Sequence, residues 1–131
     1  MNKLKGYIDS IQSSEHLSFI GVKTNGGLLY LLLLEKPIET IGSEVNLVFK
    51  ESEVILSKEL VKSTANISCG VINKIQKGKI LTHIGLLYND IEIIVLVPSV
   101  KFDMMELKLN DTVYWIINPS EISLQRSHGG K

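Results

Sequence analysis

The sequence predicts an all-β protein of two tandem five-stranded barrels, with a short helix in the second. Three observations carry this prediction. The chain repeats itself, each copy consists of short apolar or alternating segments bounded by turn residues, and only one stretch has helical spacing. The 131 residues are 44% hydrophobic and 21% charged. This composition is typical of a globular chain that buries a core.

Three segments of the first half recur in the second half. Residues 6–12 (GYIDSIQ) match 70–76 (GVINKIQ), 17–22 match 81–86, and 50–56 match 118–124. The first two matches share one offset, and the third has an offset four residues longer. The second copy therefore carries a short insertion before its last match, and the chain is predicted to be a tandem duplication.

The duplication sets the predicted domain boundaries. The first domain is expected at residues 1–60 and the second at residues 61–131, joined in the charged stretch at residues 58–63. The polar, glycine-containing end at residues 127–131 is expected to be a disordered tail of the second domain.

Each copy contains five strand-like segments. They are residues 6–11, 17–22, 28–34, 45–49 and 54–56 in the first copy, and 70–75, 81–86, 91–97, 113–117 and 122–124 in the second. Turn residues 25–27 (NGG) and 89–90 (ND) separate the second and third segments. Five short strands with tight turns predict a small barrel of the OB type.

One helix is expected, at residues 98–106. Pro98 is acceptable in a first helical turn, and Phe102, Met105 and Leu109 lie at roughly helical spacing. The inserted residues of the second copy fall in this region.

The third strands, residues 28–34 and 91–97, are almost continuously apolar. A strand with one solvated face should alternate apolar with polar residues, so both faces of these strands need cover. Since a small barrel has one interior, the outer face must meet the other copy or another subunit. We therefore expect a homo-oligomer, with packing between the two copies of a monomer as the alternative.

Charge and composition argue against several classes of protein. Fourteen basic residues balance fourteen acidic ones, which disfavours nucleic-acid and acidic-membrane binding because both need clustered positive charge. A single arginine, Arg126, and eight aromatic residues leave an OB-type nucleic-acid binder as the weakest reading. The longest apolar run is too short to span a bilayer as a helix, the start does not read as a signal peptide, and the single Cys69 fits a cytoplasmic protein.

Catalytic motifs are missing from the sequence. His16, His83 and His128 are not at metal-ligand spacing. Neither a G-x-S-x-G elbow nor a phosphate-binding glycine loop occurs. We expect no enzymatic activity and no metal held by side chains.

Several short motifs follow one another in the same order in both copies. The first copy has Asn2 before residues 6–11 (GYIDSI), then 38–45 (IETIGSEV) and 50–54 (KESEV); the second has 63–66 (STAN) before 70–75 (GVINKI), then 107–113 (LKLNDTV) and 118–122 (NPSEI). This order resembles the molbindin family, whose units are Mop or TOBE domains, over nearly the whole chain.

The resemblance implies a pair of OB-fold domains that assembles as a homo-oligomer, a dimer or a trimer, and binds molybdate or tungstate at interfaces between domains or subunits. It implies storage, buffering or homeostasis of the oxyanion without chemistry on it. A tetrahedral dianion suits backbone N–H groups, hydroxyls and a lysine, which donate charge-assisted hydrogen bonds. The alternative is a degenerate TOBE di-domain that acts as an oligomerisation or effector-sensing module of a molybdate-responsive regulator or transporter.

The resemblance also selects candidate oxyanion ligands. They are Lys50, Ser52, Ser63, Thr64, Asn66 and Lys101. The chain departs from the family pattern at Ala65, where the family has arginine, and at Asn118, where the family has lysine. The first copy begins at Met1-Asn2 and has no counterpart of Ser63.

Four of these six candidates also have a structural explanation. Ser63, Thr64 and Asn66 could order the linker through side-chain to backbone hydrogen bonds. Asn2 and Asn66 fit a role in shaping the start of each barrel better than one in binding. Lys50 could be a solvated lysine at a strand end.

Overall fold

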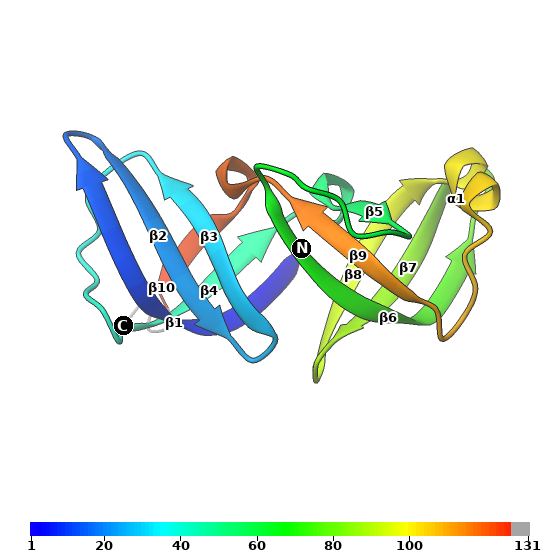
Figure 1. Cartoon of the computed structure of the whole chain (residues 1–131), viewed down its shortest axis with the longest axis horizontal. Coiled ribbons are helices and arrows are strands. Elements are labelled where there is room, and N and C mark those ends of the chain that lie inside the picture. The colour runs from blue at the N-terminus through cyan, green and yellow to red at the C-terminus, as the bar shows by residue number, and fades with distance from the viewer. Residues whose placement is uncertain (127–131) are drawn as a thin grey trace.

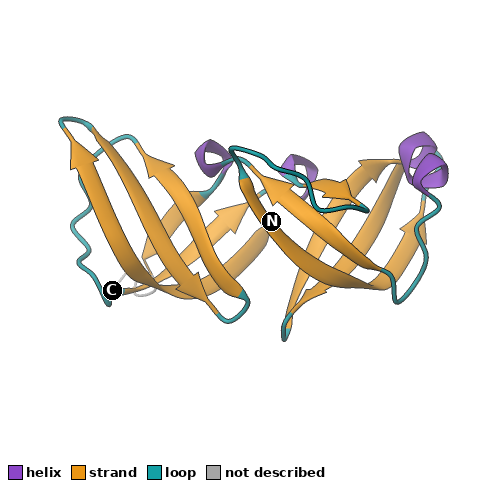
Figure 2. Cartoon of the chain, viewed as in Figure 1, coloured by secondary structure: helices purple, strands orange, loops and turns teal. Residues whose placement is uncertain are grey.

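A computed structural model of the chain describes residues 1–126 and shows two curled five-stranded sheets side by side (Figures 1 and 2). The predicted disordered tail, residues 127–131, lies outside the described residues. The elements are β1 (Asn2–Ser14), β2 (Leu17–Thr24), β3 (Gly27–Leu33), β4 (Glu44–Phe49), η1 (Glu51–Glu53), β5 (Ile55–Ser57), β6 (Asn66–Lys77), β7 (Leu81–Tyr88), β8 (Ile91–Pro98), α1 (Ser99–Met105), β9 (Thr112–Ile117), η2 (Pro119–Glu121) and β10 (Ser123–Arg126).

The two sheets exchange their fifth strands. The strand order is β10-β4-β1-β2-β3 in the first sheet, called barrel 1, and β5-β9-β6-β7-β8 in the second, called barrel 2. β5 belongs to the first sequence copy but pairs with β9, and β10 belongs to the second copy but pairs with β4. An ion pair of 2.5 Å from Arg126 to Glu39 also ties β10 to barrel 1.

The predicted all-β class and the two OB-like barrels are confirmed, and the exchange adds a feature that the repeat does not reveal. The predicted units at residues 1–60 and 61–131 follow the sequence repeat. Neither unit holds a complete sheet, however, because each contributes its last strand to the other. The chain crosses between barrels twice, at η1 and at η2 (Figure 1).

β1 alternates apolar with polar residues, as a strand with one solvated face should. In β1, Leu4 and Ile8 point into the core while Lys3, Lys5 and Tyr7 are exposed. The pairing of β1 with β2 shifts register just after Ile8, and β6 with β7 shifts at the equivalent place. Such bulges bend a long strand, so both sheets curl at the same point.

The expected helix is present in the second copy. α1 follows Pro98, buries Phe102, and ends at Met105; its C-cap Glu106 adopts a left-handed conformation with a φ of 55°. It covers one end of barrel 2 in Figure 2. Within the described residues, the matching connection of barrel 1, residues 34–43, contains no helix.

One apolar core runs through both barrels. Trp115 of β9 is fully buried and stacks on Phe49 of β4 at a centroid distance of 6.0 Å. The ring of Tyr88 meets Trp115 edge-on at 5.0 Å, and its hydroxyl lies 2.9 Å from the Thr24 hydroxyl of barrel 1. The two barrels therefore share aromatic packing at their junction.

Two asparagines link the barrels through symmetric hydrogen bonds. Asn66 of barrel 2 accepts from the Tyr30 N–H and donates to the Tyr30 carbonyl, both at 2.8 Å. Asn2 of barrel 1 makes the same pair of 2.8 Å bonds to the backbone of Ile94. Tyr30 and Ile94 lie in β3 and β8, which are edge strands, so each asparagine side chain occupies an edge that would otherwise be unpaired.

Contacts between the two copies cover part of the outer faces of the apolar strands β3 and β8. η1 lies against β8, and η2 lies against β3. Leu28 of β3 remains 41% exposed, and Phe19 of the neighbouring β2 remains 39% exposed. Packing between the two copies therefore covers these strands in part, and oligomerisation through the remaining surface stays a prediction.

Candidate functional site

The two crossovers bring parts of both sequence copies together. Lys50 precedes η1 in an extended conformation, and Asn118 occupies the same position before η2. The Asn118 side chain accepts a hydrogen bond of 3.2 Å from the Ser120 N–H. Lys50 is exposed, and no ion pair of Lys50 occurs among the described residues.

Lys50 and Ser120 line one small hollow of about 160 Å³, which we call the crossover hollow. Its polar side chains are those of Lys50, Glu53, Ser120, Glu121 and Ser123. Lys50 and Glu53 come from the first copy, and the other three come from the second. They meet because β10 crosses over to pair with β4, which places Ser123 opposite Val48.

The crossover hollow contains donors for an anion but also carboxylates. The Lys50 ammonium and the Ser120 and Ser123 hydroxyls are groups that bind oxyanions. Glu53 and Glu121 lie in the same hollow and would repel a dianion at neutral pH. Within the single chain, the two carboxylates therefore partly offset the positive charge of Lys50.

The N-terminal amino group is already neutralised beside this site. The Met1 amino group forms an ion pair of 2.5 Å with Glu51. The hydrogen bond from this amino group holds the pKa of the Glu51 carboxyl below its usual value, with help from a backbone hydrogen bond and from the charges of the amino group and His83, while desolvation opposes the shift.

The linker candidates sit next to the other crossover. The β6–β9 register pairs Asn66 with Ile117, so Ala65, one residue earlier in the chain, lies opposite Asn118. The Ser63 hydroxyl accepts a hydrogen bond of 3.0 Å from the Ala65 N–H, and Thr64 is exposed. Asn66 uses both its carbonyl and its amide on Tyr30.

Each copy thus carries half of the expected ligand set. The β1–β4 register ends with Asn2 opposite Phe49, which puts Met1 beside Lys50 and leaves no serine or threonine there. The second copy has Ser63 and Thr64 but holds Asn118 in place of the lysine. In the described part of the chain, no hydrogen bond or ion pair joins Lys50 to Ser63 or Thr64.

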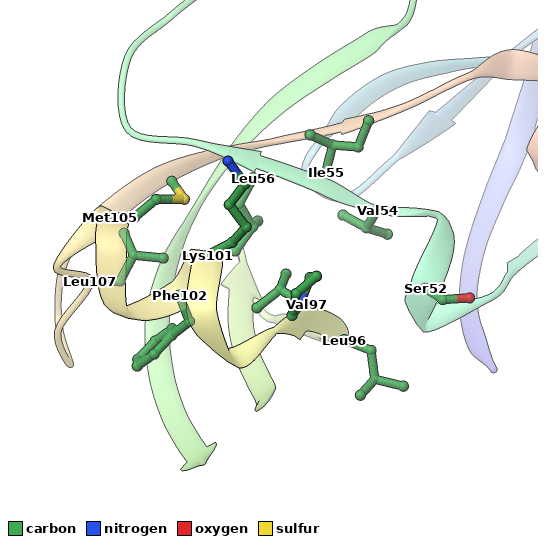
Figure 3. A pocket seen from close by; sticks show the side chains of 11 residues that line it. Ser52, Val54, Ile55, Leu56, Leu96, Val97, Lys101, Phe102, Met105 and Leu107 are labelled. Atoms are coloured by element: carbon green, nitrogen blue, oxygen red, sulfur yellow. The ribbon is translucent and has the colours of Figure 1, made fainter. Parts of the chain in front are cut away.

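Ser52 and Lys101 line a different and larger hollow of about 410 Å³, which we call the helix cavity (Figure 3). It lies between η1, β5, β8 and α1. Apolar side chains make up most of its lining, and Lys101 is its only charged residue. Such a lining is poor for a tetrahedral dianion, because a buried charge needs several polar partners.

A third hollow, of about 600 Å³, has a basic lining that sequence reasoning missed. Lys3, Lys5 and Lys23 line it together with Tyr7. The sequence held part of the signal, because Lys3 and Lys5 lie two residues apart and therefore share one face of a strand. The register, which brings Lys23 opposite Tyr7, is visible only in the structure. Lys5 also forms an ion pair of 3.5 Å with Glu44. The Lys5 side chain is exposed and the Glu44 side chain is half-buried, so solvent screening leaves the pair a small contribution to stability.

Other chemistry finds few groups to work with. Among residues 1–126, no group of three or more histidine, cysteine, aspartate or glutamate side chains could hold a metal ion. His16 and His83 are exposed, as is Cys69, and His128 lies outside the described residues. No helix in the described chain is both long enough and apolar enough to cross a membrane.

Comparison with solved structures gives a match over both barrels. A crystal structure of the cytoplasmic molybdate-binding protein ModG, grown from PEG with molybdate bound, superposes with a TM-score of 0.88. The chain is similar to a molybdate-binding protein. The match covers 95% of this chain and 95% of ModG at 22% sequence identity, so the likeness is one of fold. No family model matches the sequence, and no curated protein matches it either.

Proposed function

We propose that the chain binds molybdate, or the related oxyanion tungstate, and that it stores or buffers this anion in the cytoplasm. The observation that carries the proposal is the likeness in fold to ModG over 95% of both chains. The crossover hollow adds to it, because it places the lysine of one copy beside two hydroxyls of the other.

We further propose that the complete sites form between subunits of a homo-oligomer. Lys50 has no hydroxyl-bearing linker beside it in its own copy. In the second copy, which holds Ser63 and Thr64, Asn118 occupies the position equivalent to Lys50. Bringing the first crossover of one subunit against the linker of another would unite Lys50 with Ser63, Thr64 and their backbone N–H groups. Exposed apolar residues on the outer faces, such as Leu28 and Phe19, supply surface for that contact.

Isothermal titration of anion-free protein with molybdate, tungstate and sulfate tests this proposal, with light scattering to give the oligomer mass. We expect binding of molybdate and tungstate that sulfate does not displace. Lys50→Ala should weaken molybdate binding by about tenfold or more, because it removes a charge-assisted hydrogen bond. Lys79→Ala is the matched control, since Lys79 is exposed and lines none of the three hollows.

Two outcomes would contradict the proposal. If Lys50→Ala and Lys79→Ala weakened molybdate binding equally, the crossover hollow would not be part of the anion site. The absence of heat with all three anions, from a well-folded oligomer, would favour the oligomerisation or effector-sensing module instead. This second function is motivated by Ala65 and Asn118, which stand where the molbindin pattern has arginine and lysine.

A further inference from the structure

The helix cavity has the size and lining of a site for an organic ligand. Its volume of about 410 Å³ lies within the usual range for ligand pockets, which are mostly apolar with a few polar groups. Val97, Phe102 and Met105 contribute apolar surface, and Ser52 stands at the η1 end (Figure 3). No carboxylate lines the cavity.

The cavity exists because barrel 2 is not closed by a ladder at this point. β5 and β8 are the two edges of its sheet, and β5 has only three residues. The backbone of Ile94 in β8 is occupied by Asn2, and η1 covers part of the same strand. Side chains alone therefore fill the space between β5 and the end of β8, with α1 beside them.

Lys101 gives this cavity an unbalanced positive charge. Asp103 is the only acidic residue within α1, and it is already paired with Lys77 at 2.6 Å. Lys101 has no ion pair in the part of the chain that the structure describes. Its side chain extends from α1 toward β5 in Figure 3, so its ammonium group stands over otherwise apolar walls.

We infer that the helix cavity binds a small amphipathic carboxylate, with the aliphatic or aromatic body in the cavity and the carboxylate on Lys101. Apolar burial would provide the affinity, and the charge-assisted hydrogen bond to Lys101 would fix the orientation. The cavity shares no lining residue with the crossover hollow. This second site is therefore separate from the crossover hollow.

The methionines provide a direct test. The chain has three of them: Met105 lines the cavity, Met104 is 68% exposed on the same helix, and Met1 lies at the crossover hollow. Sodium octanoate should be titrated into the full chain labelled with ¹³C at the methionine methyl groups. We expect the Met105 signal, assigned with Met105→Leu, to shift and saturate while those of Met104 and Met1 stay in place.

Probes and variants separate the two parts of the ligand. Acetate lacks the apolar body and should leave Met105 unmoved, while octan-1-ol lacks the charge and should bind about tenfold more weakly than octanoate. Lys101→Met should lower the affinity for octanoate to that for octan-1-ol and leave the affinity for octan-1-ol unchanged. Lys79→Met is the control. Val97→Phe should abolish the binding of both octanoate and octan-1-ol, because the larger side chain fills the cavity, while the spectrum remains that of a folded chain.

Three results would overturn the inference. One is an octanoate titration in which Met105 does not shift at millimolar concentration, and another is equal weakening by Lys101→Met and Lys79→Met. The third is a Met105 signal that responds to protein concentration and not to octanoate, which would mean that a second copy covers the cavity.

Discussion

Replacing Asn66 by alanine should loosen the junction between the barrels by a measurable amount. The Asn66 side chain makes two hydrogen bonds of 2.8 Å to the Tyr30 backbone, and both are partly buried. Each such bond contributes about 0.5–1.5 kcal/mol net, so the variant should lose about 1–3 kcal/mol of unfolding free energy. With a urea m-value of about 2 kcal/mol/M, the unfolding midpoint should fall by roughly 1 M.

Urea unfolding followed by tryptophan fluorescence measures this loss, because the single Trp115 is buried where the barrels meet. Protein concentration must be held constant, since an oligomer gains apparent stability by mass action. Asn2→Ala should give a similar loss through Ile94. Asn73→Ala, which removes an exposed amide, should stay within about 0.5 kcal/mol of the parent. A midpoint for Asn66→Ala equal to that of Asn73→Ala would refute the assigned role.

Three further predictions follow from other contacts. Gly26→Ala should destabilise the chain by about 1–3 kcal/mol in the same assay, because the new Cβ would lie 2.2 Å from the Tyr88 ring; an unchanged midpoint would show that the ring moves freely. The lowered pKa of Glu51 means that its ion pair stabilises the folded state at neutral pH and that this contribution is lost as pH falls through the folded-state pKa; Glu51→Gln should therefore flatten the acid limb of a stability profile, and parallel curves would contradict this. A chain ending at Ile122 lacks β10, so amide exchange should accelerate in β4 of barrel 1 and not in β9 of barrel 2, which pairs with β5; acceleration in β9 instead would argue against the strand exchange.

The strands and the duplication could be predicted from the sequence because they depend on local patterns. The matched segments at residues 6–12 and 70–76 are the centres of β1 and β6, and both copies bulge at the same place. The four-residue change in offset correctly located the extra helix, since α1 occupies the connection that lacks a helix in the first copy.

The exchange of β5 and β10 could not be predicted. The two segments have the same apolar pattern, and either would fit the end of either barrel. Which barrel receives each strand depends on the direction of the chain after β4 and β9, and no short-range pattern encodes that direction. The crossover hollow was missed for the same reason, because Lys50 meets Ser120 only as a result of the exchange.

The asparagine links show a partial success. The sequence favoured a structural role for Asn2 and Asn66 at the start of each barrel. The structure shows the form of that role, in which each amide imitates one pair of a β-ladder. A contact of this kind joins residues far apart in the chain, such as Asn2 and Ile94, and therefore leaves no local signal.

The exchanged fifth strands give the chain the geometry of two identical molecules that have swapped an arm and then been fused end to end by residues 58–65. In an unfused pair every substitution appears twice, once on each side of the two-fold axis. After fusion a substitution appears once, so the halves are free to specialise while their ratio stays fixed at one to one. Two such single-sided changes are visible. Lys50 of the first copy corresponds to Asn118 of the second, and α1 occurs in the second copy while residues 34–43 of the first contain no helix.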